Sequence, residues 1–221
     1  MTRIACLGHS GFMVEHRGLT LLFDPWIDGN PACPYQDQAG IAKADYIFVS
    51  HDHDDHGFAE GVAIARRLNA RLAAINELAR LAADQGVTGT LRGNLGGSII
   101  TEDLTVKFVR AYHSCAIGVP CGFIVDLGDL VLYHAGDTDF FSDMAFLYPK
   151  PIDVAFLPMG SCFTMGPQEA AWAVAKIQPR LVIPMHYNTF PPIKQDPRGF
   201  VELVGDLAEV RVLAPGERTE I

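Results

Sequence analysis

The feature that most constrains this chain is a run of six residues that reads His51-Asp52-His53-Asp54-Asp55-His56. It directly follows residues 46–50, where Tyr-Ile-Phe-Val is an apolar run typical of a buried strand. Imidazoles and a carboxylate suit a borderline cation such as zinc. At a strand end, alternate side chains can face one ion while their neighbours reach another. The alternative interpretation is a surface loop that binds metal only incidentally.

Three further candidate ligands lie beyond other predicted strands. His113 follows residues 104–110, Asp137 lies in the stretch His134-Ala135-Gly136-Asp137-Thr138, and His186 follows residues 181–184. Loops that leave neighbouring strands gather at one end of a sheet, so we expect these side chains to converge. Taken singly, either histidine would more often be a structural or surface residue.

The order of predicted elements favours two mixed sheets with helices outside them over a doubly wound parallel sheet. Hairpins dominate early in the chain, and strand–helix alternation follows. We predict strands at 3–7, 11–15, 19–24, 46–49, 98–100, 104–110, 122–127, 130–134, 153–157, 181–184 and 210–213, and helices at 58–68, 76–84, 167–177 and 197–208, with Asn76 and Asp196 as caps. A length of 221 residues fits a single domain over residues 1–221.

Composition narrows the class of protein. The formal net charge is −9 and no basic stripe is present, so we expect a small-molecule substrate and no nucleic-acid partner. The five cysteines form no CxxC pair, which favours a reducing compartment. Without a signal-peptide pattern or a long apolar stretch, the prediction is a cytoplasmic protein that has no membrane partner. Assembly into a homo-oligomer stays open.

Several short stretches together resemble the metallo-β-lactamase superfamily. They are the histidine motif and Leu7-Gly8-His9-Ser10, Phe23-Asp24-Pro25, Tyr133-His134-Ala135-Gly136-Asp137-Thr138, Phe163-Thr164-Met165-Gly166-Pro167 and His186-Tyr187-Asn188-Thr189-Phe190-Pro191. Within that superfamily the chain is similar to compact metal-dependent hydrolases related to L-ascorbate-6-phosphate lactonases. The resemblance implies an α/β (α+β) fold, a four-layer αββα sandwich of two mixed sheets with outer helices.

The same resemblance implies a dinuclear site with two divalent metal ions per chain. Zinc is expected, with manganese, nickel and iron as alternatives. The implied ligands are His51, His53 and His113 for the first ion, and Asp55, His56 and His186 for the second, with Asp137 bridging both.

The implied reaction is hydrolysis by a hydroxide held between two ions. The expected substrate is a small anionic ester, lactone or phosphodiester. Asp55 and Asp137 would orient the hydroxide, and the candidate proton donors are His9, His134 and Tyr187. Two other functions stay open, an iron-dependent oxidoreductase on the same scaffold and a non-catalytic metal-binding protein. The intact His53 argues against the first, because di-iron relatives tend to carry a carboxylate in place of a first-site histidine.

Secondary roles are less constrained by the sequence. Asp24 could orient a ligating imidazole or accept a turn hydrogen bond before Pro25. His9 and Ser10 could contact an anionic group or form a polar turn. We expect Cys162 to be a buried structural cysteine and the aromatic residues of 140–146 to belong to the core.

Overall fold

The computed structural model describes residues 1–221 and divides them into two units. Unit 1 contains Met1–Asn94, Ser114–Pro120 and Leu213–Ile221, and unit 2 contains Leu95–His113 and Cys121–Val212. Each unit therefore combines segments that are distant in the sequence. The prediction of a single domain over residues 1–221 stays a prediction.

Unit 1 is built on a seven-stranded mixed sheet. Its strands in spatial order are β14 (Arg218–Glu220), β1 (Thr2–Gly8), β2 (Gly11–His16), β3 (Leu19–Phe23), β4 (Tyr46–Phe48), β5 (Arg71–Ile75) and β6 (Thr90–Gly93). The first three pairings are antiparallel and the last three are parallel. Tight turns at Gly8-His9 and Arg17-Gly18, all with positive φ, allow the β1–β2–β3 meander.

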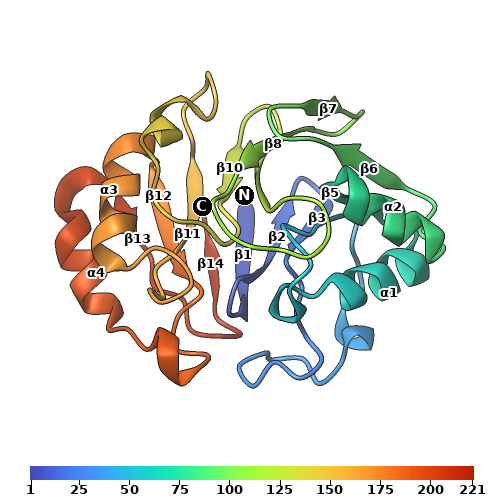
Figure 1. Ribbon diagram of the computed structural model, residues 1–221, viewed down its shortest axis with the longest axis horizontal. Coiled ribbons are helices and arrows are strands. Elements are labelled where there is room, and N and C mark those ends of the chain that lie inside the picture. Colours follow the sequence, from blue (N-terminus) through green and yellow to red (C-terminus); the bar gives the residue numbers. More distant parts are fainter. The chain divides into compact units, whose positions relative to one another are not determined.

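Two helices cover the parallel part of this sheet. Helix α1 (Phe58–Leu68) packs on β4 and β5, and α2 (Asn76–Asp84) packs on β5 and β6 (Figure 1). Each helix buries an apolar stripe, with Val62, Ile64 and Ala65 on α1 and Leu78, Ala79 and Ala82 on α2. Because β3 and β4 pair in parallel, their carboxyl ends lie at the same end of the sheet. A short 3₁₀ helix, η1 (Gln38–Gly40), lies in the loop before β4.

Unit 2 repeats the same pairing pattern in a second seven-stranded sheet. The strands are β7 (Ser98–Ile100), β8 (Thr105–Arg110), β9 (Cys121–Asp126), β10 (Val131–His134), β11 (Val154–Pro158), β12 (Leu181–Met185) and β13 (Glu209–Val210). Pairings from β7 to β10 are antiparallel, and those from β10 to β13 are parallel. Helices α3 (Pro167–Ile177) and α4 (Pro197–Val204) pack on each other (Figure 1). The 3₁₀ helices of unit 2 are η3 (Ser142–Phe146), η4 (Pro191–Ile193) and η5 (Gly205–Leu207).

The predicted pair of mixed sheets with helices is confirmed, and the doubly wound alternative is wrong because half of the pairings are antiparallel. The sequence pattern missed β5, β6 and β14. Helix α4 ends at Val204 because Gly205 takes a positive φ of 52°, which starts η5. Asn76 is the first residue of α2 and not its cap, which is Ile75. The last predicted strand, 210–213, is only Glu209–Val210.

None of the helices has the length and apolar character that a membrane span would require.

Candidate metal-binding clusters

The histidine motif lies where β4 ends in unit 1. His51 is buried and leaves the sheet after Ser50, while His53 precedes the short 3₁₀ helix η2 (Asp54–His56). The Nε2 atom of His51 lies 3.0 Å from Nδ1 of His53. Ring nitrogens this close can share one proton or bind one cation. The motif therefore places two nitrogen donors side by side.

The carboxylate of Asp24 orients the third motif histidine. Asp24 Oδ2 lies 2.7 Å from Nδ1 of His56, and Asp24 Oδ1 accepts a hydrogen bond from the Ser50 backbone N–H at 2.7 Å. With Nδ1–H donated to the carboxylate, a neutral His56 presents the lone pair of Nε2, the arrangement typical of a metal-ligating histidine. Asp24 therefore takes the orienting role that the sequence left open.

Ser50 is the residue that sequence reasoning missed. Its Oγ donates to Asp24 Oδ2 at 2.7 Å and lies 2.9 Å from Nδ1 of His51 and 3.2 Å from Nδ1 of His56. One hydroxyl thus contacts both imidazoles and the carboxylate. Its position between a buried strand and the motif was the only signal available.

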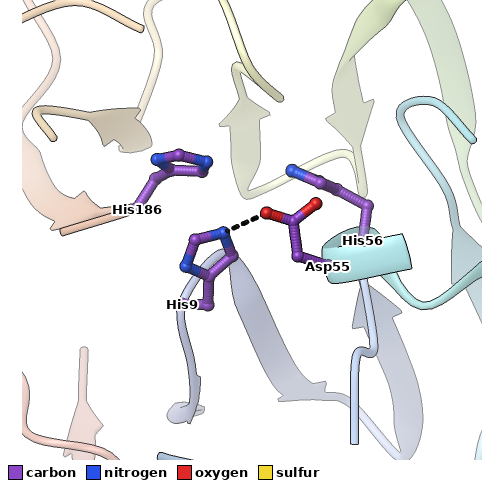
Figure 2. A group of neighbouring side chains, drawn as sticks. All are labelled: His9, Asp55, His56 and His186. Atoms are coloured by element: carbon purple, nitrogen blue, oxygen red, sulfur yellow. Dashed lines mark ion pairs between the residues drawn. The ribbon is translucent and has the colours of Figure 1, made fainter. Parts of the chain in front are cut away.

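His9 joins the motif from the β1–β2 turn. Figure 2 shows the contact between its Nε2 and Oδ2 of Asp55, which are 3.2 Å apart, with His56 next to Asp55. The ligand atoms of these three residues lie within 4.8 Å of one another. The His9 ring is buried and meets Trp26 edge-on at 5.4 Å between centroids. His9 is consequently part of the cluster and not merely a turn residue.

Gly57 permits the close approach that holds this cluster together. Its φ is +66°, and a Cβ at this position would lie 2.3 Å from the Trp26 nitrogen and 2.4 Å from the Pro25 carbonyl carbon. These are backbone atoms that cannot rotate away. The turn after Asp24 therefore lies directly against the end of the motif, and only glycine fits between them.

Unit 2 gathers the three remaining candidate ligands around one carboxylate oxygen. Asp137 Oδ2 lies 2.9 Å from Nε2 of His186 and 3.6 Å from Nε2 of His113. The residues follow β10, β12 and β8 in turn, as predicted, and Asp137 and His186 are buried. A carboxylate that faces two imidazoles can form ordinary hydrogen bonds or share a cation with them.

Backbone geometry shapes the turns that carry these ligands. The Gly136 N–H donates to Nδ1 of His134 at 3.3 Å, so the buried His134 ring braces the turn before Asp137. His186 has a φ of 56°, and a Cβ on Gly160 would lie 2.1 Å from the His186 carbonyl oxygen. Left-handed backbone in non-glycine residues costs free energy and gathers at functional sites. The proton-donor role of His134 stays a prediction.

Two expectations about the loops of unit 2 are wrong. Cys162 is exposed, because it lies with Ser161 in a left-handed turn after β11. Among the aromatic residues of 140–146, Phe141 is buried as expected, but Phe146 is 85% exposed at the end of η3. Tyr187 is half-buried after His186, and its proton-donor role stays a prediction.

The donor set fits a divalent cation. Unit 1 supplies imidazole nitrogens, one with its tautomer set by Asp24, and carboxylate oxygen from Asp55. Unit 2 supplies two imidazoles and the carboxylate of Asp137. Nitrogen and oxygen donors without cysteine suit zinc and also manganese, iron or nickel.

A family model described as the β-lactamase superfamily domain matches residues 3–186. The chain belongs to this superfamily. Among its relatives, a UPF0173 metal-dependent hydrolase of Caldivirga maquilingensis is 48% identical over 219 residues, which cover 96% of this chain and 94% of the relative. This degree of identity shows that the chain also belongs to the UPF0173 metal-dependent hydrolases. The narrower relation to ascorbate-6-phosphate lactonases stays a prediction.

Solved structures confirm the metallo-β-lactamase fold of this superfamily member. Igni18, described as a novel metallo hydrolase from the hyperthermophilic archaeon Ignicoccus hospitalis, matches with a TM-score of 0.92 and 35% identity over 100% of both chains. CmlA, a diiron β-hydroxylase from Streptomyces venezuelae, matches with a TM-score of 0.78 and 16% identity over 100% of this chain and 54% of its own. The second match shows the fold alone.

We expect Asp24→Asn to weaken metal binding about 10–100-fold while the protein still folds. Asparagine tolerates the left-handed backbone of this position, where φ is 39°, so the change isolates the carboxylate. An amide cannot accept equally well from both Ser50 and His56. Competition with a chromogenic chelator measures the affinity, and Asp84→Asn, on the exposed end of α2, is the control. Equal affinity in both variants would refute the orienting role.

Proposed function

We propose that this protein hydrolyses a small anionic ester, lactone or phosphodiester with two divalent metal ions, zinc being the expected metal. The observation that carries the proposal is the single Asp137 oxygen that faces the Nε2 atoms of His186 and His113. A carboxylate in that setting can neutralise cations and leave coordination positions open for water and substrate. Membership of the UPF0173 metal-dependent hydrolases supports the reaction type.

The resemblance to the metallo-β-lactamase superfamily supplies the proposed ligands of both ions. The proposed assignment is His51, His53 and His113 for one ion, and Asp55, His56 and His186 for the other, with Asp137 bridging them.

When bound, the ions would supply Lewis acidity and lower the pKa of coordinated water. The chain's own residues would orient the attacking water and protonate the leaving group. Asp55 and Asp137 are the proposed hydrogen-bond acceptors that would orient the attacking water. His9 is the favoured proton donor, because its Nε2 lies 3.2 Å from the Asp55 carboxylate and therefore at the cluster. His134 and Tyr187 are the other candidates.

The charge of the protein supports an anionic substrate only when cations are bound. With a formal charge of −9, the metal-free protein repels anions at long range. Two bound divalent ions would make the local electrostatic potential at the clusters positive, because bound cations are the largest charges in such a site. Binding of an anionic substrate should therefore require metal.

The test is a substrate screen on metal-stripped protein reloaded separately with zinc, manganese, nickel or iron. We expect turnover of p-nitrophenyl acetate, a γ-lactone or bis-p-nitrophenyl phosphate only after metal is added, and none in the chelated control. Metal binding without turnover on any probe would contradict an enzyme and favour a metal-binding protein. Coloured iron protein that consumes dioxygen and hydrolyses nothing would favour an oxidoreductase, a chemistry that the related fold of CmlA accommodates.

A further inference from the structure

Residues Ser114–Pro120 form a segment that joins β8 to β9. Both strands belong to the sheet of unit 2, yet the contacts of the segment place it in unit 1. Most of its residues are exposed or half-buried, so little apolar burial holds it in place. A segment of this kind needs specific contacts to keep one conformation.

One such contact comes from inside the histidine motif. Oδ1 of Asp52 accepts a hydrogen bond from the Ala116 backbone N–H at 3.0 Å, although the two residues are 64 positions apart. Asp52 lies between His51 and His53 in the sequence and belongs to none of the proposed ligand sets. Hydrogen bonds to a charged acceptor are stronger than neutral ones, so this bond is a substantial constraint on an exposed segment.

A second contact fixes the other half of the segment. Gly118 has a φ of +75°, and a Cβ on it would lie 2.7 Å from Cγ2 of Ile75 and 3.0 Å from Oε2 of Glu77. The segment therefore rests directly on the end of β5 and the start of α2. Burial, and after it the negative charge of Asp52, raises the pKa of the thiol of Cys115, which precedes Ala116, and this agrees with a carboxylate beside the segment.

The chain length between the anchor and a proposed ligand is short. His113 directly precedes the segment, and Ala116 is three residues further on, a span of at most about 10 Å when extended. Fixing Ala116 therefore restricts the positions that His113 can reach. Loss of the anchor would release both the segment and the ligand before it.

We propose that Asp52 is a positioning residue that fastens segment 114–120 to the histidine motif and thereby sets the place of His113. The bond itself is independent of any reaction, whereas its effect on metal binding rests on the proposed function. Outer contacts of this type typically change metal affinity by 10–100-fold.

The test compares Asp52→Ala, which removes the acceptor, with Asp52→Asn, which keeps a carbonyl oxygen at the same place. Hydrogen–deuterium exchange of the Ala116 amide is measured on metal-free protein. We expect exchange about tenfold or more faster in Asp52→Ala and a smaller acceleration in Asp52→Asn, whose neutral oxygen accepts a weaker hydrogen bond. Asp54→Ala, the motif's other unassigned and exposed aspartate, should leave the amide protected. Unchanged protection in Asp52→Ala would overturn the anchor.

Metal affinity is the second readout on the same variants. We expect about a tenfold loss in Asp52→Ala, a smaller loss in Asp52→Asn, and no loss in Asp54→Ala. If Asp52→Asn lost as much affinity as Asp52→Ala, charge and not the bond would be responsible, and the positioning role would fall. If wild-type protein bound no metal, the proposed function would fail, while the exchange of the Ala116 amide would still decide whether Asp52 fastens the segment.

Discussion

Replacement of Asp137 by asparagine should remove one bound metal ion and lower turnover at least about 100-fold. The carboxylate Oδ2 faces Nε2 of both His186 and His113, so a single group serves both imidazoles. Asparagine keeps the size but removes the charge and the second equivalent oxygen. Two cations would then repel each other with less compensation, and the more weakly held one should leave. Metal analysis after dialysis and steady-state kinetics measure the two effects.

Asp143→Asn is the matched control in the same unit. Its carboxylate pairs with Arg110 at 2.8 Å on the surface, and such exposed pairs contribute about 0–1 kcal/mol. We expect it to retain both ions and its turnover. If Asp137→Asn behaved like this control, Asp137 would not bridge two ions, and the ligand assignment would have to be rebuilt around Asp24 and Asp52.

Gly57→Ala should lower the stability of the protein by about 3 kcal/mol or more. The added methyl group would meet backbone of Pro25 and Trp26 within 2.5 Å, and overpacking of this kind costs about 1–3 kcal/mol. The left-handed backbone adds about 1–2 kcal/mol for a residue with a side chain. For a chain of this length the melting temperature should fall by about 6–12 °C. Scanning calorimetry measures the shift.

Gly29→Ala separates the two causes. Gly29 has a φ of +80° but nothing within 4 Å of an added Cβ, so only the backbone cost of about 1–2 kcal/mol applies. Metal affinity should fall in Gly57→Ala, because His56 and Asp55 directly precede this glycine, and should stay unchanged in Gly29→Ala. Equal melting temperatures for the two variants would show that the turn after Asp24 yields freely, contrary to the packing described here.

The sequence predicts elements well where the physics is local. The strand before His51 is an uninterrupted run of apolar strand formers, and its end carries the motif. Strand β5 was missed because Arg-Leu-Ala-Ala-Ile contains alanines that have little preference for strands. Burial between β4 and β6 decides its conformation, and that information is not contained in a short window of sequence.

Within the candidate site, too, local sequence patterns are recognisable and long-range contacts are not. His51, His53, Asp55 and His56 are recognisable because they are neighbours in the sequence. The role of Asp24 depends on a partner 32 residues away, and that of Asp52 depends on a partner 64 residues away. The sequence therefore left two roles open for Asp24 and predicted none for Asp52. Ser50 carries no pattern of its own, since a serine after a strand usually ends a turn.

The metal content of the fully loaded protein tests the central claim most directly. Metal-free protein is equilibrated with excess zinc, dialysed, and analysed for zinc and protein on the same sample. The proposed ligand set predicts two tightly bound ions per chain. Saturation at one ion, with no second site under metal excess, would contradict the dinuclear centre.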